Sequence, residues 1–183
     1  MEKSKQPLLR TVIGMMISPA GALKSALSGR WYISAAVSAV AFGLFFFQTG
    51  LDLYKTGQKD FMFVIMFTGL GLAYGAVFIP LMGSLFWWII KMTKTAMSLP
   101  QAVSTFCLCY SGALIYGISG LVFSLALGWK TAVAFGVTGV LWATGPIIHS
   151  IRQMTGGKTA LSVSLATVAG VAILFSWSLF GRI

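Results

Sequence analysis

Charged residues are scarce in this chain, and acidic residues are almost absent. Only 9% of its 183 residues are charged, with three Asp or Glu against thirteen Lys or Arg and a single histidine. A soluble domain carries roughly 25% charged residues, so this composition could not cover a water-soluble fold. The few titratable groups also leave too little to build a catalytic acid–base pair. We therefore expect no enzymatic activity, no cofactor and no metal site.

Cysteine is nearly absent as well, which limits redox and metal chemistry. The two cysteines, Cys107 and Cys109, stand two positions apart inside an apolar stretch. Residues at positions i and i+2 of a helix point to different sides, so we expect neither a disulfide nor a shared metal between them. Both are interpreted as small packing residues.

What the chain does have is long stretches without a single charge, and its mean hydropathy is +0.89. Each stretch reaches the about 20 apolar residues that cross a ~30 Å hydrocarbon core. A helix also satisfies its own backbone hydrogen bonds, which lipid cannot do. The sequence therefore predicts an all-α membrane protein, a compact bundle of five transmembrane helices that forms one domain at 31–183. The predicted spans are about 31–50, 61–90, 101–127, 131–149 and 159–180.

The first thirty residues (1–30) are expected to form a cytoplasmic amphipathic segment. Apolar residues recur at helical spacing within 8–18, with Arg10 among the residues on the opposite side. Such a pattern predicts a short helix that lies on the membrane surface. A simple lead-in to the first span is the alternative. No apolar run of signal-peptide type follows the charged start, so we do not expect cleavage.

Basic residues gather on one side of the predicted spans. Nine of the thirteen precede span one or lie between spans two and three or four and five, and four lie on the other side. This bias predicts a cytoplasmic N-terminus and an outside C-terminus. We expect the basic face to contact anionic headgroups rather than nucleic acid. Its predicted interfacial residues are Arg10, Lys24, Arg30, Trp31, Trp87, Trp88, Lys91, Lys94, Arg152 and Lys158.

Two further features concern the second span and the loop before it. Residues 61–90 would form a helix of about 45 Å, which predicts a strong tilt, a kink at Pro80 or a protruding end. In the preceding loop, Asp52 and Asp60 flank two lysines. We interpret that loop as a solvated, charge-balanced turn.

Small residues recur every four positions in each predicted span. Helices in lipid associate through close backbone packing, which small side chains allow. We expect these residues to pack the bundle, with contact to a second copy or to other membrane proteins as a further role. They are Ala35, Ala39, Gly43, Gly71, Gly75, Ala113, Gly117, Gly139, Ala143, Ser162, Ala166 and Gly170.

Three short motifs carry a family resemblance. They are Ile17-Ser18-Pro19 ahead of five spans, the run Cys107-Leu108-Cys109-Tyr110-Ser111 in span three, and Trp142 inside span four. This layout resembles the Yip-domain (Ypt/Rab-interacting protein) family of five-span membrane proteins, in a short bacterial form. The resemblance implies a non-enzymatic scaffold of the inner membrane. An accessory subunit of a larger membrane complex and a channel or transporter component remain as alternatives.

Overall fold

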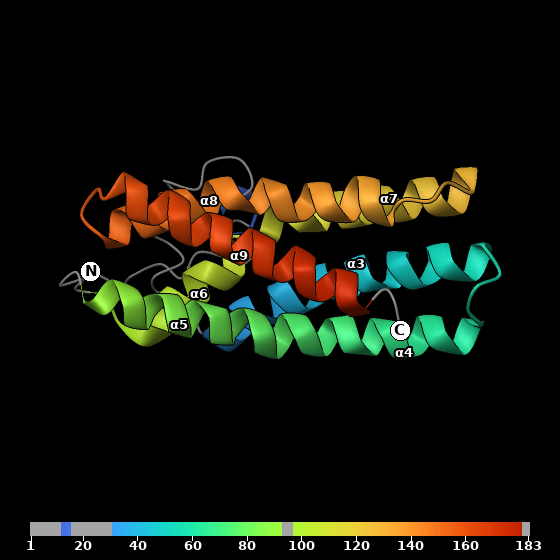
Figure 1. Cartoon of the computed structure of the whole chain (residues 1–183), viewed down its shortest axis with the longest axis horizontal. Coiled ribbons are helices and arrows are strands. Elements are labelled where there is room, and N and C mark those ends of the chain that lie inside the picture. Colours follow the sequence, from blue (N-terminus) through green and yellow to red (C-terminus); the bar gives the residue numbers. More distant parts are fainter. Residues whose placement is uncertain (1–11, 16–30, 93–96, 181–183) are drawn as a thin grey trace, which may run out of the picture.

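The computed structural model describes residues 12–15, 31–92 and 97–180, and their regular structure is entirely helical. Five helices are long and apolar enough to cross a membrane. Figure 1 shows them lying along the long axis of one bundle. The expected five-helix membrane fold is therefore confirmed. The spans are Trp31–Lys55, Phe61–Lys91, Leu99–Leu127, Ala132–Met154 and Thr159–Phe180.

Three of these spans change their helical geometry along their length. The first span is the single helix α3 (Trp31–Lys55), and the last is α9 (Thr159–Phe180). Spans one and four extend past their predicted ends at 50 and 149, because helical hydrogen bonding continues beyond the apolar stretch into the polar end residues. The second span comprises α4 (Phe61–Ala73), the π-helical turn η1 (Tyr74–Phe78) and α5 (Ile79–Lys91). The third span comprises α6 (Leu99–Leu108) and α7 (Ser111–Leu127). The fourth span comprises the π-helical η2 (Ala132–Val137) and α8 (Thr138–Met154).

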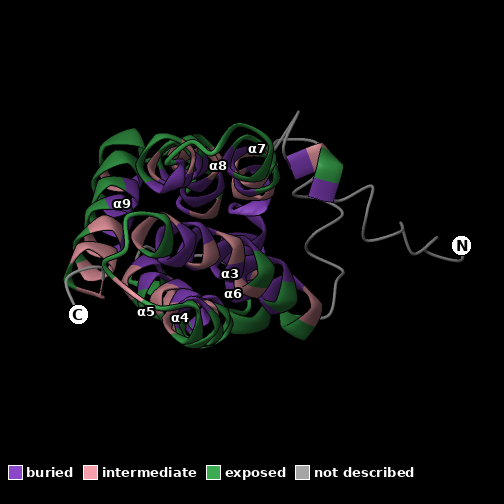
Figure 2. Ribbon diagram, turned by 90° about the vertical axis from the view of Figure 1, so that its right-hand side faces the viewer, coloured by how far each residue is buried: buried purple, intermediate pink, exposed green. Residues whose placement is uncertain are grey.

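Helix α3 is the centre of the packing. It contacts α4, η1, α6, α7 and η2, whereas α9 packs mainly against α8. Figure 2, which looks along the bundle, shows α3 between the α4–α5 side and the α7–α8 side. Its mid-span aromatic residues Phe42, Phe45 and Phe46 are all buried. The first span is thus the element around which the other four are arranged.

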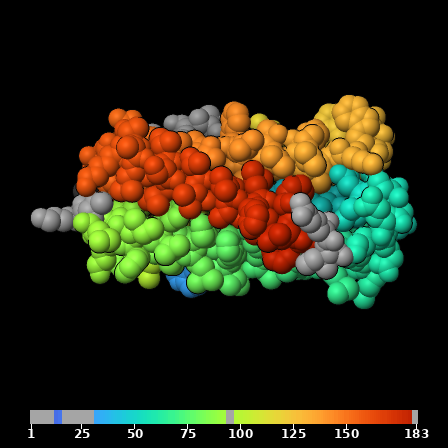
Figure 3. Space-filling model, in the orientation of Figure 1, coloured from blue at the N-terminus to red at the C-terminus, as the bar shows by residue number. Residues whose placement is uncertain are grey.

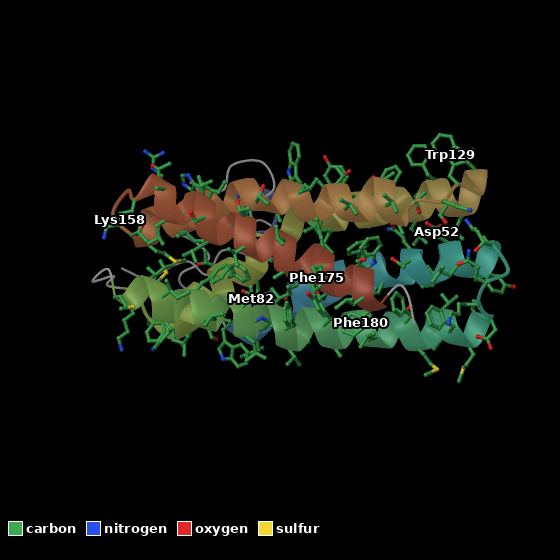
Figure 4. All side chains as sticks on the ribbon, in the orientation of Figure 1. Asp52, Met82, Trp129, Lys158, Phe175 and Phe180 are labelled. Carbon is green, nitrogen blue, oxygen red and sulfur yellow. The ribbon has the colours of Figure 1, made fainter. Side chains whose placement is uncertain are left out.

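The helices differ in length, and this gives the bundle two distinct ends. The second span has 31 residues and α9 has 22, which correspond to about 46 Å and 33 Å. In Figure 1, α9 stops short of the turn between α3 and α4. We call the end with Lys91, Arg152 and Lys158 the basic end. The end with the α3–α4 and α7–η2 turns is the hairpin end, and Figure 4 shows Asp52 and Trp129 there, opposite Lys158.

The third span is not the single helix that the sequence predicted. It breaks at Cys109 and Tyr110, where Tyr110 has φ −84° and ψ 4°. No proline occurs within 101–127, so the break has another cause. The ring of Tyr110 is fully buried against Phe42, with ring centroids 5.2 Å apart. At the break, the hydroxyl of Ser111 donates to the carbonyl of Leu108 at 2.6 Å, which gives that carbonyl a hydrogen-bond partner.

Of the predicted N-terminal amphipathic helix, the structure describes only residues 12–15, and these are helical. Val12 and Met15 are buried and belong to the hydrophobic core, whereas Ile13 is 44% exposed. This turn therefore packs against the bundle. The remainder of the predicted helix lies outside the described residues.

Candidate functional site

A tight contact between α3 and the second span is built on the predicted small residues Gly71 and Gly75. A Cβ atom at position 75 would lie 2.4 Å from the carbonyl oxygen of Ser38 and 2.6 Å from Cα of Ala39, and one at position 71 would lie 2.5 Å from Cβ of Phe46. Real Cβ atoms essentially never approach a neighbour within 3.0 Å. Glycine at both positions is therefore what allows these two helices to approach so closely.

The same contact contains a hydrogen bond that spans two helices. In the π-helical turn, the amide of Ile79 donates to Tyr74, five residues back, rather than to Gly75. The next residue, Pro80, has no N–H to offer. The carbonyl of Gly75 has thus lost its helical donor, and the hydroxyl of Ser38 donates to it at 2.8 Å. A buried backbone group is satisfied across the interface instead of within its own helix.

Other predicted positions on α3 face looser contacts. Ala35 is buried, and a Cβ atom at Gly43 would meet the flexible end of Leu72 at 2.7 Å. On the same helix, the buried side chain of Gln48 donates through Nε2 to the carbonyl of Gly117 at 2.5 Å. Helix α3 therefore contacts its neighbours through both small residues and a polar side chain.

In spans three and four, the structure brings two of the predicted stripes together. A Cβ atom at Gly139 would lie 3.3 Å from Cα of Ala113, and Ala143 one turn further along is fully buried. Gly117 instead faces the first span, since a Cβ there would lie 3.1 Å from Cβ of Leu44. The small residues of α7 thus pack against two neighbouring spans, the first and the fourth.

The stripe on α9 faces α8. Ser162, Ala166 and Gly170 are all buried. A Cβ atom at Gly170 would lie 3.7 Å from Thr144, an ordinary contact distance. The hydroxyl of Ser162 donates to the carbonyl of Lys158, the residue just before α9, at 2.8 Å. This interface is therefore looser than the one at Gly75.

Three glycine contacts were not predicted from the sequence, one of them at Gly120, where a Cβ atom would lie 2.6 Å from Oε1 of Gln48. A Cβ atom at Gly136 would lie 2.0 Å from the ring of Phe45, and one at Gly112 would lie 2.7 Å from the ring of Trp142. Gly136 follows Ala132 at a spacing of four, a signal that could have indicated it. Gly112 has no small residue four positions away on either side, so the sequence carries no comparable signal there.

Aromatic side chains fill the interior beside these contacts. The ring of Phe42 lies 5.3 Å from that of Tyr74 and 5.2 Å from that of Tyr110. The hydroxyl of Tyr74 is hydrogen-bonded to Ser176 of α9 at 2.6 Å. Cys107 and Cys109 are both buried free thiols. Among the described residues, no group of three or more His, Cys, Asp or Glu could hold a metal ion.

At the basic end, several predicted interfacial residues gather around the end of α5. The indole of Trp87 donates to the carbonyl of Met97 at 2.9 Å, and the ammonium of Lys91 lies 5.0 Å from the centre of the Trp87 ring. Trp88 is 64% exposed. The Trp87 ring thus connects the end of span two to the loop before span three.

The other predicted interfacial residues are placed separately. Trp31 is half exposed, with its ring 6.4 Å from that of Tyr32. Arg152 and Lys158 are exposed at the ends of α8 and α9. The remaining ones, Arg10, Lys24, Arg30 and Lys94, lie outside the described residues.

At the hairpin end, the turn predicted to be solvated and charge-balanced is exposed at 54–58 and at Asp60, whereas Asp52 is half-buried. The amide of Ala132 donates to Oδ2 of Asp52 at 2.8 Å, and Asp60 accepts a hydrogen bond in the first turn of α4. The ammonium of Lys55 donates to the carbonyl of Ser124, and to its hydroxyl at 2.7 Å. These charges lie near helix ends with unpaired backbone groups, which charged side chains stabilise.

The hollows of the bundle differ greatly in size. A side groove of about 400 Å³ opens between spans one, two and three, and a hairpin-end pocket of about 350 Å³ opens between spans one, four and five. Two hollows between helices measure only about 10 Å³ each. The side groove is lined by Trp31, Ala76, Val77, Pro80, Leu81, Ser84, Leu99, Pro100 and Val103. The hairpin-end pocket is lined by Thr49, Asp52, Leu53, Thr56, Gln58, Lys130, Ala132, Val133, Trp177 and Ser178.

Five apolar helices packed into one bundle define a multi-span helical membrane protein. Compared with protein-family models, with curated proteins and with solved structures, the chain gave no match.

Proposed function

We propose that this protein is a non-enzymatic membrane scaffold of the Yip-domain type, which binds another membrane protein or a second copy of itself through a helix face inside the bilayer. In this proposal the chain lies in a bacterial inner membrane with its basic end in the cytoplasm. The observation that carries the proposal is the side groove. Unlike the interfaces described above, this surface is left open by the bundle.

The floor of the side groove is a second stripe of small residues. Ala76, Pro80 and Ser84 follow one another at spacing four and all line the groove. Val77 and Leu81 beside them are 57% and 60% exposed. Since helix association in lipid depends on close backbone approach, a groove with a small-residue floor and apolar rims fits a partner helix.

Pro80 in this stripe leaves a backbone carbonyl without its helical donor, and a partner helix can supply one. Because Pro80 has no N–H, it cannot donate to the carbonyl of Ala76, four residues earlier. The carbonyl of Gly75 has its substitute donor in Ser38 on α3. Ala76 lies on the exposed side of the same turn and lines the groove. A Ser, Thr or other hydrogen-bond donor on a partner helix would be favourable there.

The small inner hollows favour a scaffold over a channel. The hollow beside Phe42 and Gly136 and the one beside Phe86 and Ile147 each hold about 10 Å³, about the volume of one water-sized probe. Neither accommodates a solute. The proposal therefore uses the lateral surface of the bundle and not its interior.

Site-specific photocrosslinking in native membranes tests this function. A photoreactive amino acid at Leu81, in the groove, is expected to give a discrete protein adduct. The matched positions Val168 and Val171, 54% and 61% exposed on α9, are expected to give none. An adduct of twice the chain mass identifies a second copy. A different mass that co-purifies stoichiometrically in mild detergent identifies a subunit of a larger complex. No discrete adduct at Leu81, or the same adducts from α9, would contradict the proposal.

A further inference from the structure

The register between the first two spans shows how far the basic end extends past Trp31. The hydrogen bond from Ser38 to the carbonyl of Gly75 fixes this register, and the two spans, joined by a short turn, run antiparallel. Trp31, seven residues before Ser38, is therefore level with Met82, seven residues after Gly75. The side groove gives the same register, because Trp31 lines it together with Leu81.

Helix α5 continues well beyond that level. It ends at Lys91, nine residues after Met82, which corresponds to about 13 Å along a helix. Helix α8 ends beside it, since one small hollow is lined by Ile90 of α5 and by Ile151 and Met154 of α8. Figure 3 shows α5 and the α8–α9 turn at this end of the molecule, with the blue start of α3 further along the bundle. The basic end thus projects past the level of Trp31.

The side chains of α3 mark out a length that matches the apolar core of a bilayer. Trp31 and Tyr32 are 49% and 50% exposed, and such aromatic side chains are typical of the membrane–water interface. From Trp31 to Asp52, at the hairpin end, α3 rises by about 31 Å. A hydrocarbon core measures ~30 Å. The level of Trp31 is therefore one boundary of the core, and the level of Asp52 is the other.

The outer face of α8 changes from apolar to polar at the same level. Trp142 is 55% exposed on this helix. Ile147 lines the small hollow together with Gly83 of α5, the residue that follows Met82. Beyond Ile147, toward the basic end, Arg152 and Gln153 are exposed. A second span therefore places the edge of the apolar core well before the end of α5.

Charges of one sign gather on the projecting end. Lys91, Arg152 and Lys158 are exposed there, whereas Asp52 and Asp60, the acidic residues that the structure describes, lie at the hairpin end. The headgroup layer adds about 5–8 Å on each side of the core, so a projection of about 13 Å reaches through the layer of the lipid phosphates. Positive charge at that depth is complementary to anionic lipids.

We propose that the basic end stands outside the hydrocarbon core and binds the phosphate groups of anionic phospholipids in the leaflet on its own side. Trp88, 64% exposed on α5, then lies about 9 Å outside the core, among the headgroups. The second span crosses the core with residues 61–82 and needs no strong tilt. This inference does not depend on the proposed scaffold function, because headgroup binding makes no use of the side groove.

Spin labels on the second span test the depth. Ile65→Cys and Trp88→Cys, each in a chain whose Cys107 and Cys109 are replaced by alanine, carry a nitroxide in vesicles of phosphatidylcholine and phosphatidylglycerol. Ile65 and Trp88 are 56% and 64% exposed and stand eleven and twelve residues from the middle of the span. A span centred in the bilayer would hold both labels at nearly the same depth. We expect oxygen, which concentrates in hydrocarbon, to relax the label at 65, and a water-soluble nickel complex to relax the label at 88. Equal accessibility at the two positions would overturn the proposal.

Lipid retention tests the contact with phosphate. Native mass spectrometry of the full chain, released from nanodiscs with equal amounts of phosphatidylglycerol and phosphatidylcholine, measures its preference for the anionic lipid. Arg152→Gln and Lys158→Gln, each made alone, should lower this preference by roughly two- to fivefold, as the loss of one basic side chain near an anionic surface does. Lys59→Gln, beside Asp60 at the hairpin end, is the matched control and should retain the wild-type preference. The proposal is overturned if the wild type shows no preference for phosphatidylglycerol, or if both basic-end variants behave as Lys59→Gln does.

Discussion

The hydroxyl oxygen of Ser38 and the carbonyl oxygen of Gly75 lie 2.8 Å apart, and the hydrogen bond between them joins spans one and two. It exists because Pro80 and the π-helical turn before it deprive that carbonyl of its helical donor. A local irregularity of the second span thereby becomes a specific contact with the first. The stability of the bundle should depend on this pair in a way that can be measured.

Ser38→Ala should lower the free energy of unfolding by about 1 kcal/mol, within the range measured for hydrogen bonds between membrane helices. The buried carbonyl of Gly75 would be left without a donor. Unfolding in mixed detergent micelles, followed by circular dichroism, measures the change. Ser162→Ala is the matched control, because the hydroxyl of Ser162 bonds to Lys158 at the start of its own span rather than to another helix, and this change should be near neutral.

A double-mutant cycle with Pro80→Ala tests the cause. An alanine at position 80 restores the N–H, so the helix can return to its normal hydrogen bonding and satisfy Gly75. In that background, Ser38→Ala should cost clearly less than in the wild type. Equal costs in both backgrounds would show that the hydroxyl does not compensate for the proline.

Gly75→Ala should destabilise the bundle by about 1–3 kcal/mol, as overpacking of a close contact does. The added methyl would lie 2.4 Å from the carbonyl oxygen of Ser38, which is backbone and cannot move aside alone. Gly69→Ala, in the same span, is the control, since a Cβ there meets nothing within 4 Å. It should be neutral or slightly stabilising, because alanine favours helix. Thermal unfolding in detergent that ranks the two variants equally would contradict this.

Lys55→Met should loosen the end of α7. The ammonium of Lys55 donates to the carbonyl and hydroxyl of Ser124 and, at 3.5 Å, to the carbonyl of Trp129. We expect faster amide hydrogen exchange over 124–131, with a loss of roughly 0.5–1 kcal/mol as for an exposed cation at a helix C-terminus. Lys59→Met, a lysine over the ring of Phe63, should leave exchange in this segment unchanged.

The proposed orientation puts the hairpin end outside the cell. A cysteine at Gln58, which is exposed in the α3–α4 turn, should react with a membrane-impermeant maleimide added to intact cells. A cysteine at Gly157, exposed in the loop between α8 and α9, should react only after the cells are lysed. Cys107 and Cys109 are replaced by alanine to remove background. The reverse labelling pattern would invert the topology.

Sequence patterns were sufficient for the class of fold because lipid imposes a strict rule. A backbone in hydrocarbon must satisfy its own hydrogen bonds, so an uncharged apolar stretch of sufficient length predicts a helix. The stripe Gly71 and Gly75 also predicted a helix contact, since small residues at that spacing allow two helix backbones to approach closely. Neither rule says which helix lies opposite. Gly112 has no small residue four positions away, so no sequence pattern predicted its contact with the ring of Trp142.

Apolar length, charge bias and small-residue spacing are local properties, and from them the sequence alone determined five membrane helices in one bundle. The tertiary structure alone decided which residues meet. The break at Tyr110 lies where the ring of this residue packs against Phe42 of another span. The pairing of Ser38 with Gly75 needs two spans held side by side. The hydrogen bond from the amide of Ala132 to the carboxylate of Asp52 needs spans one and four side by side at the hairpin end. Such contacts depend on distances between helices that are far apart in the chain, and no periodicity within one helix encodes them.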